Sequence, residues 1–335
     1  MVVMRRLRFI ALAAAFSALN CAFGAFSLMW PTESRAFLNG ESYEAFIQPT
    51  LGNAPSSGLF GDVRNGGYRF HEGIDIKPAR RDRKGEPLDD VYAAMPGTVM
   101  LANNVPSASG YGRYVVLEHK NCDVALYTLY AHLKEIDPAV KAGARVDAGS
   151  RLGQMGRSAE YKIAKEAAHL HFEIGLRYGN NFQKWYDLQK FGSKNHFGNF
   201  NGMNLQGLDP LDFMRAAREG RLKNGIANYI LSRKTAFVVR YYNPKTPDFA
   251  LRYMKLADFT GSGLGWDIHF TWFGLPKKIE RIKNPDTGRK KGDIELVYVD
   301  ESEIGRKCRV FVQKDKKGRF ICTKLLKDTL DKMFF

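Results

Sequence analysis

Residues 168–174, with the sequence Ala-His-Leu-His-Phe-Glu-Ile, carry the pattern from which the fold is predicted. Polar and apolar side chains alternate along this stretch, and successive side chains of a β-strand point to opposite faces of a sheet. His169, His171 and Glu173 would therefore share one face, while the apolar residues between them would pack into a core. The stretch predicts a β-strand that carries two imidazoles side by side.

Further strand-like segments surround this stretch between residues 60 and 176. Residues 91–94, 97–102, 114–119 and 125–131 are rich in Val, Leu and Tyr and are separated by Gly, Pro and Asn turns. Turn signals that recur about every 8–12 residues favour an antiparallel β-domain over alternating strands and helices. We predict a mainly β protein, in which an antiparallel sheet occupies residues 60–215 and ends in a helix near residues 211–222.

Another histidine, His71, stands four residues before Asp75. The two share one side of an extended segment, and Gly73 between them disfavours a helix. Imidazole nitrogen and carboxylate oxygen are the ligands that zinc takes when thiolates are absent, and three protein ligands leave a fourth position open for water. His71 and Asp75, together with one of the histidines at 169 and 171, therefore form a candidate catalytic metal site.

At this point the chain resembles the LytM or lysostaphin-type zinc endopeptidases, which hydrolyse peptidoglycan. The resemblance covers residues 60–174 and rests on three motifs in order: H-x-x-x-D at residues 71–75, Y-x-H-L at residues 130–133 and H-x-H at residues 169–171. Flanking features match as well, namely Phe60-Gly61 with Arg64, residues 91–94 with 97–99, Gly110-Tyr111-Gly112, and Leu152-Gly153.

The resemblance implies a role for individual residues. His71, Asp75 and His171 would ligate one zinc ion per chain. His132 and His169 would be the catalytic pair: one accepts a proton from a zinc-activated water, and the other supports the oxyanion or protonates the leaving amine. We favour His169 as the base, although the sequence does not assign the two roles. Tyr111 would hydrogen-bond the tetrahedral intermediate, and a packing role in its turn is the competing interpretation.

One loop departs from the family pattern. Family members carry a short turn ending in Gly-Pro directly before H-x-H, whereas this chain has a longer, charged segment at residues 157–168. The rim of the groove is therefore altered, which affects substrate preference rather than metal binding.

Charge divides the chain unevenly. The formal net charge is +16, and residues 25–215 contribute 22 basic and 21 acidic residues. Residues 216–335 contribute 26 basic and 14 acidic residues, so nearly all of the excess lies there. We predict a smaller, basic, β-rich (α+β) C-terminal domain at residues 216–335, with strands near 236–242, 266–273 and 294–299, a final helix near 324–333, and its own partner.

The N-terminus has the pattern of an export signal. Three arginines precede an apolar run from Phe9 to about Phe23, which predicts a signal peptide at residues 1–24 and a lead-in segment at residues 25–59. An uncleaved anchor is the alternative. Export places the protein in the periplasm, at the cell surface or outside the cell. There, Cys308 and Cys322 could form a disulfide across a hairpin or remain free thiols.

Three functions fit these observations. The first is a metallopeptidase that acts on peptidoglycan peptides, held near anionic wall polymers or a membrane surface by its basic domain. The second is a non-catalytic or occluded wall-binding or regulatory module of the same fold, against which the complete set of ligands and histidines argues. The third, nucleic-acid binding by residues 216–335, is opposed by export and by the lack of a recognisable motif. The sequence leaves the oligomeric state open.

Overall fold

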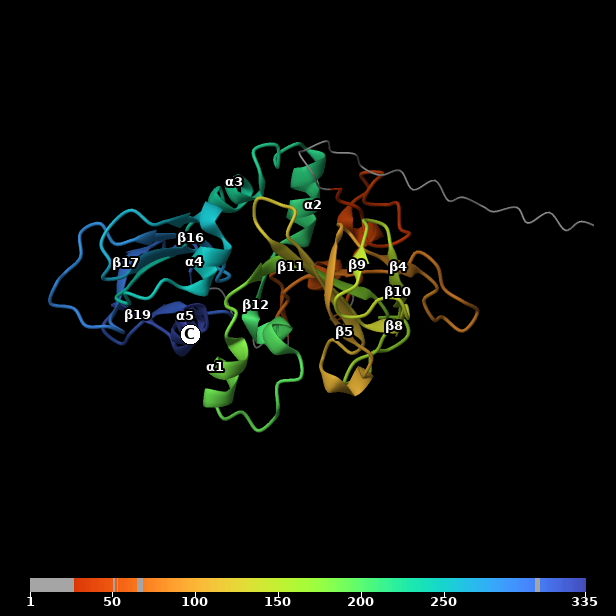
Figure 1. The fold of residues 1–335 in the computed structure, drawn as a ribbon. Coiled ribbons are helices and arrows are strands. Elements are labelled where there is room, and N and C mark those ends of the chain that lie inside the picture. The colour runs from red at the N-terminus through yellow and green to blue at the C-terminus, as the bar shows by residue number, and fades with distance from the viewer. Residues whose placement is uncertain (1–26, 51, 53, 65–68, 305–307) are drawn as a thin grey trace, which may run out of the picture.

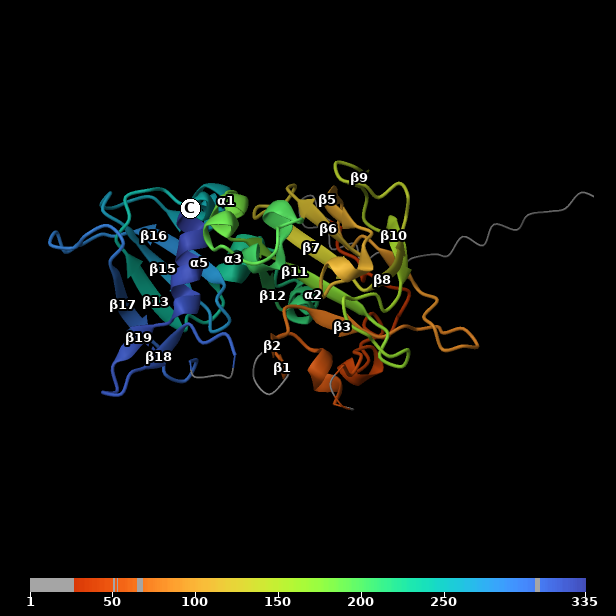
Figure 2. The ribbon, with the colours of Figure 1, turned by 90° about the horizontal axis from the view of Figure 1, so that it is seen from below.

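The computed structural model describes residues 27–335 except 51, 53, 65–68 and 305–307. The predicted signal peptide at residues 1–24 lies outside the described residues. Figures 1 and 2 show two β-rich halves side by side, with helices α1 to α3 and strand β12 between them. No helix within the described residues has the length and apolar character needed to cross a membrane.

The N-terminal half is built on a seven-stranded antiparallel sheet. Its strands follow the order β12-β11-β7-β6-β5-β9, and β3 also pairs with β11. The members are β3 (Ile74–Ile76), β5 (Gly97–Asn103), β6 (Tyr114–His119), β7 (Leu126–Ala131), β9 (Arg145–Val146), β11 (Leu170–Arg177) and β12 (Leu205–Leu208). This sheet confirms the predicted fold class.

Strand β11 shows the alternation that the sequence predicted. Leu170, Phe172 and Ile174 are fully buried in the hydrophobic core, and the histidines and Glu173 occupy the opposite face. Two partners fix the position of His171 on this strand: Asp75 of β3 lies directly opposite on one side and Ala131 of β7 on the other. Strand pairing thus brings the three sequence motifs to one place.

Smaller sheets complete the N-terminal half. Strands β4 (Asp90–Tyr92), β10 (Arg151–Met155) and β8 (Leu133–Ile136) form an antiparallel sheet in the order β4-β10-β8. A short pair, β1 (Val63–Arg64) and β2 (Arg69–Phe70), precedes the first histidine.

Three helices lie between the halves, α1 (Phe182–Leu188), α2 (Pro210–Arg218) and α3 (Ile226–Leu231). Asp209 caps the N-terminus of helix α2, because its carboxylate accepts hydrogen bonds from the backbone N–H groups of Leu211 and Asp212. This capping satisfies donors that have no partner within the helix. Pro210 at the first helical position fits the same start.

The C-terminal half contains a second sheet, in the order β14-β16-β15-β13-β17. Strands β14 and β16 run parallel to each other, and the other pairs of this sheet are antiparallel. A hairpin and two helices accompany the sheet. The bounds are β13 (Phe237–Tyr241), α4 (Asp248–Arg252), β14 (Ala257–Asp258), β15 (Trp266–Phe270), β16 (Pro276–Arg281), β17 (Ile294–Val299), β18 (Val312–Lys314), β19 (Phe320–Cys322) and α5 (Lys324–Phe334). Cys308 and Cys322 are free thiols in this structure.

The two halves share a continuous hydrophobic core rather than a linker. One cluster of contacting buried side chains includes members from both sheets and from α5. At the junction, the Phe60 and Phe273 rings lie 5.1 Å apart, and the Phe70 and Trp272 rings lie 5.8 Å apart. Edge-to-face aromatic pairs of this kind add to the free energy of burial. The C-terminal half is therefore packed directly against the segment that carries His71.

Candidate metal centre

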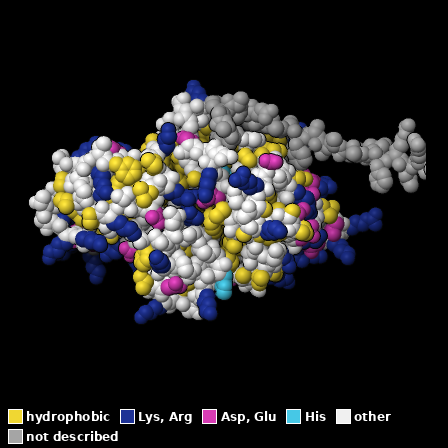
Figure 3. Space-filling model, in the orientation of Figure 1, with side chains coloured by type: hydrophobic (Ala, Val, Ile, Leu, Met, Phe, Trp, Pro, Cys, Tyr) yellow, Lys and Arg dark blue, Asp and Glu magenta, His cyan; other side chains and the backbone are white. Residues whose placement is uncertain are grey.

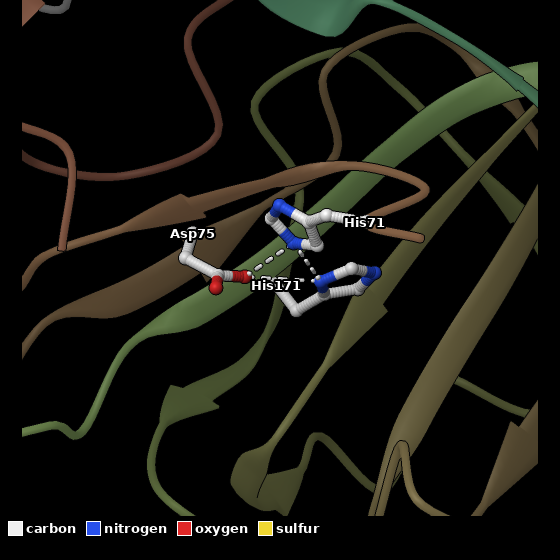
Figure 4. Close-up of side chains that lie close together, drawn as sticks. All are labelled: His71, Asp75 and His171. Atoms are coloured by element: carbon white, nitrogen blue, oxygen red, sulfur yellow. Dashed lines mark hydrogen bonds and ion pairs between the residues drawn. The ribbon is translucent and has the colours of Figure 1, made fainter. Parts of the chain in front are cut away.

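Three side chains from distant parts of the sequence converge beside β11. His71, Asp75 and His171 are all buried, and one candidate ligand atom from each lies within 4.8 Å of the others. Asp75 Oδ1 lies 3.0 Å from His71 Nε2 and 3.0 Å from His171 Nδ1. Figure 4 shows the three side chains pointing toward one another. The arrangement follows from the β3–β11 register, which places Asp75 opposite His171.

The second carboxylate oxygen of Asp75 faces away from the histidines. Arg64 Nη2 lies 2.6 Å from Oδ2, and the Thr50 hydroxyl donates to the same oxygen at 2.9 Å. Although burial raises the pKa of Asp75, the neighbouring His169 and His71 hold it well below its usual range. Arg64 and Thr50 thus orient the Asp75 carboxylate, and Oδ1 faces His71 and His171.

Hydrogen bonds determine which ring nitrogen of His71 and of His171 faces the point where the three side chains meet. His71 Nδ1 lies 2.8 Å from the Leu59 carbonyl oxygen, which fixes the proton on that nitrogen and leaves Nε2 bare. In His171 the order is reversed, because Nε2 lies 3.0 Å from Glu173 Oε1 and Nδ1 faces Asp75. Each imidazole therefore presents a lone pair to the same point, as metal ligation requires.

Charge around His171 favours a cation. The ring lies between two buried carboxylates, Asp75 and Glu173. Burial alone would lower the pKa of His171, but hydrogen bonds to these carboxylates raise it to about 9. Two histidine nitrogens and one carboxylate oxygen form the donor set of a zinc site with an open position. The residues present therefore fit a divalent metal ion.

Two further histidines lie beside the three candidate ligands. His169 Nδ1 lies 2.6 Å from the Ala167 carbonyl oxygen, and its Nε2 is 3.4 Å from Asp75 Oδ1. His132 Nδ1 lies 2.9 Å from the Ser158 carbonyl oxygen. The two rings are 4.8 Å apart. Burial lowers the pKa of both imidazoles, that of His132 well below its usual range. The Nδ1 of each ring faces a backbone carbonyl, which leaves Nε2 able to accept a proton.

His132 adopts an unusual backbone conformation. Its φ of 63° lies in the left-handed region, which costs about 1 kcal/mol for a residue other than glycine. It directly follows Ala131, the last residue of β7, which pairs with His171. The chain thus leaves β7 with a strained residue that turns its imidazole toward the centre.

Tyr111 lies beside the centre but its hydroxyl is already engaged. The Tyr111 hydroxyl donates to Glu173 Oε1 at 2.7 Å, and the Tyr127 hydroxyl donates to Glu173 Oε2 at 2.7 Å. Burial and the nearby Glu173 carboxylate raise the pKa of Tyr111 well above its usual value. Both tyrosines thus hold Glu173 in place, and Glu173 in turn holds His171.

The centre opens into a cavity of about 960 Å³. The altered loop contributes to its wall through Tyr161, Lys162, Ile163 and Ala164. The C-terminal half contributes Arg309, Leu325, Thr329 and Lys332. The histidines therefore stand in a cleft that both halves shape.

Sequence comparison finds one segment of the chain to be similar to a known family. Residues 69–183 match the model of peptidase family M23, and this segment contains His71, Asp75, His132, His169 and His171. This segment is therefore similar to peptidase family M23, which confirms the resemblance predicted from the motifs. The match spans 115 of the 335 residues.

Several solved structures are similar to parts of the chain. A zinc-containing peptidase from Vibrio cholerae is 27% identical, with a TM-score of 0.27, and the match covers 39% of this chain and 33% of that one. A putative glycyl-glycine endopeptidase LytM from Ruminococcus gnavus is 28% identical, with a TM-score of 0.26, and 32% and 40% are covered. The chain thus spans less than half the length of either relative.

The catalytic domain of the antimicrobial peptidase lysostaphin from Staphylococcus simulans is 20% identical. Its TM-score is 0.32, with 54% of this chain and 98% of that chain covered. No curated protein matches the chain.

For several residues of the site, the sequence alone predicts no role. The sequence does indicate that Glu173 lies on the same face of the strand as the two histidines, because it continues their alternation with apolar residues. Arg64 was one of the flanking family features, but nothing in the sequence paired it with Asp75. Arg309 and Lys332 have no sequence signal, since they reach the cleft only through the packing of the two halves.

Proposed function

We propose that the protein is an exported zinc metalloendopeptidase that hydrolyses peptide cross-links of bacterial peptidoglycan. One observation carries the proposal: four buried imidazoles and one carboxylate converge, and hydrogen bonds leave a bare nitrogen on each imidazole ligand facing the same point. A structural cluster of histidines would have no need for this shared orientation. The match to peptidase family M23 supports the same conclusion.

His71, Asp75 and His171 would hold one zinc ion through Nε2, Oδ1 and Nδ1. Bound zinc would supply a Lewis acid for the scissile carbonyl and would lower the pKa of water to ~7. Arg64 and Thr50 orient Asp75, and Glu173 orients His171.

His169 is the general base in this proposal. Its Nδ1 proton is committed to the Ala167 carbonyl, so Nε2, beside Asp75, is the atom that receives the proton from water. His132, whose Nδ1 is similarly committed to Ser158, would stabilise the oxyanion or pass a proton to the leaving amine. The contact of Tyr111 with Glu173 supports positioning of that carboxylate, which differs from the predicted contact with the tetrahedral intermediate.

The basic C-terminal half is proposed to hold the enzyme near anionic wall polymers or lipid headgroups. Lys and Arg side chains outline the lower edge of that half in Figure 3. Long-range attraction of this kind weakens as salt increases. The division into a peptidase domain at residues 60–215 and a basic domain at 216–335 is part of the same proposal.

The test is digestion of purified peptidoglycan by the full-length protein without its signal sequence. Wild-type protein is compared with His169→Ala, each loaded with zinc, and with wild-type protein treated with a chelator and then resupplied with zinc. We expect cross-link fragments to be released by wild type alone, to vanish with the chelator and to return with zinc. Fragment masses identify the bond that is cleaved.

A zinc-loaded wild-type protein that releases no fragments would contradict the proposal and favour a non-catalytic wall-binding module. Release that continues unchanged in His169→Ala would contradict the role of His169. Asp147→Ala, which changes an exposed residue of the same half, serves as a control for nonspecific effects of substitution.

A further inference from the structure

Helix α5 places a buried cation in the wall of the cleft. Lys332 lines the cavity with only 8% of its surface exposed. Its Nζ donates to the Met203 carbonyl at 2.6 Å and lies 4.7 Å from the centre of the Tyr178 ring. Among the described residues, no carboxylate forms an ion pair with it. A buried charge without a counter-ion is costly, so its position at a cleft calls for a ligand.

Arg309 places a second cation in the same wall. Its Nη1 donates to Gln206 Oε1 at 3.0 Å, and its Nη2 lies 3.4 Å from Glu72 Oε1. Both Arg309 and the preceding Cys308 have left-handed φ values, 52° and 65°. Two consecutive non-glycine residues in this region are strained, and such strain concentrates at ligand sites. Arg309 lines the same cavity as His71 and His171.

The two cations belong to one cluster. Gln206 Oε1 accepts hydrogen bonds from both Arg309 and the Tyr178 hydroxyl, the latter at 2.6 Å, and Lys332 lies over the Tyr178 ring. Burial, reinforced by the Arg309 guanidinium, lowers the pKa of Lys332 to about 7. Binding of an anion beside Lys332 would favour its charged form.

The cavity as a whole has an excess of positive charge. Five cationic side chains and two glutamates line it, Arg64, Arg69, Lys162, Arg309 and Lys332 against Glu72 and Glu160. Arg64 is neutralised by Asp75, and Glu72 faces Arg309. Lys332 therefore remains as the buried cation that an incoming anion would meet.

We propose that Arg309 and Lys332 form a subsite that binds a free carboxylate of the peptide substrate. This inference rests on the peptidase function proposed above, because carboxylates are the anionic groups of unmodified peptides. Guanidinium and ammonium groups form charge-assisted hydrogen bonds with carboxylates. The C-terminal half would thus favour cross-links that carry a free carboxylate.

The test uses two forms of one substrate. Cross-linked muropeptides from purified peptidoglycan are compared with the same muropeptides after conversion of their carboxylates to carboxamides. For zinc-loaded wild type we expect kcat/KM to be about tenfold or more higher for the carboxylate form, as a lost charge-assisted hydrogen bond predicts. Lys332→Met and Arg309→Gln should reduce this ratio toward one.

Two variants serve as controls. Lys327→Met removes an exposed charge from the same helix and should keep the wild-type ratio. Arg309→Lys keeps the charge and should retain part of the preference. Melting temperatures of all variants establish that they are folded. Equal rates of wild type on both substrates, or a ratio that Lys332→Met and Arg309→Gln leave unchanged, would overturn the subsite.

A binding measurement without turnover tests the subsite independently of the peptidase activity. Calorimetry with zinc-loaded His169→Ala measures affinity for both muropeptide forms without turnover. We expect tighter binding of the carboxylate form, lost when Lys332→Met is added. If wild type cleaves neither form but this selectivity is present, the proposed function fails and the subsite stands. If both forms are cleaved at equal rates and bound equally, the subsite fails and the peptidase stands.

Discussion

His171 Nε2 lies 3.0 Å from Glu173 Oε1, on the opposite side of the ring from Asp75. The two residues are neighbours on one face of β11, so this contact is built into the strand. It fixes the proton on Nε2 and turns Nδ1 toward His71 and Asp75, the other two candidate metal ligands. Tyr111 and Tyr127 complete the arrangement by donating to the two oxygens of Glu173.

Glu173→Gln should weaken zinc binding by about tenfold, because carboxylates that orient a ligating histidine contribute 10–100-fold to metal affinity. The uncharged amide holds the His171 proton less strongly and leaves its Nδ1 less basic. Competition with a chromophoric chelator measures the affinity. Glu135→Gln, at an exposed position on β8, is the control. An unchanged affinity in Glu173→Gln would show that Glu173 does not support the metal centre.

Lys332→Met should stabilise the protein in neutral and acidic solution. Burial lowers the pKa of Lys332 from 10.5 to about 7, so between these values the unfolded chain binds a proton that the folded chain does not. Stability of the wild type therefore rises with pH across this window, and the penalty is fully present below it. Removing the charge should raise the free energy of unfolding by roughly 2–4 kcal/mol below pH 7 and by little near pH 10.5.

Thermal unfolding at several pH values checks this prediction, with Lys327→Met as the matched control. Asp328 and Arg309 also act on Lys332, and both are present in wild type and control. A destabilised Lys332→Met at pH 6 would contradict the assignment of Lys332 as a buried, unpaired cation. Stabilisation combined with loss of carboxylate selectivity would be a trade-off between stability and function.

Asp123→Ala should loosen the connection between the two halves. The Asp123 carboxylate accepts hydrogen bonds from the backbone N–H groups of Ile226 and Ala227, both at 3.0 Å, at the start of α3. Loss of such a helix cap costs about 1 kcal/mol of stability. A lower midpoint in chemical denaturation, with unchanged zinc affinity, is the expected result. Asp147→Ala should unfold as the wild type does.

Much of the fold was predictable because its signals are local. The alternation in residues 168–174 predicted the buried and polar faces of β11, and burial of Leu170, Phe172 and Ile174 confirms it. The histidines and Asp75 were brought together by motifs whose order and spacing match a known family. Their assignment as ligands and catalytic residues remains a prediction, although the strand register places them at one centre.

The rest of the cleft was not predictable, because it depends on contacts between the halves. From the sequence, Lys332 is indistinguishable from an exposed charged residue of an amphipathic helix. It lies beside Tyr178 because of the way α5 packs. Arg309 reaches Glu72 across the junction that Phe60 and Phe273 form. Local sequence patterns carry no information on such pairings.

In the proposed mechanism, one set of residues holds the metal ion and another accepts and donates protons. The most direct measurement is zinc content per chain alongside peptidoglycan-digesting activity for wild type, His71→Ala and His169→Ala. We predict one zinc ion per chain in wild type and in His169→Ala, activity in wild type alone, and loss of both zinc and activity in His71→Ala. Full zinc occupancy in His71→Ala, or loss of zinc together with activity in His169→Ala, would contradict this division of roles.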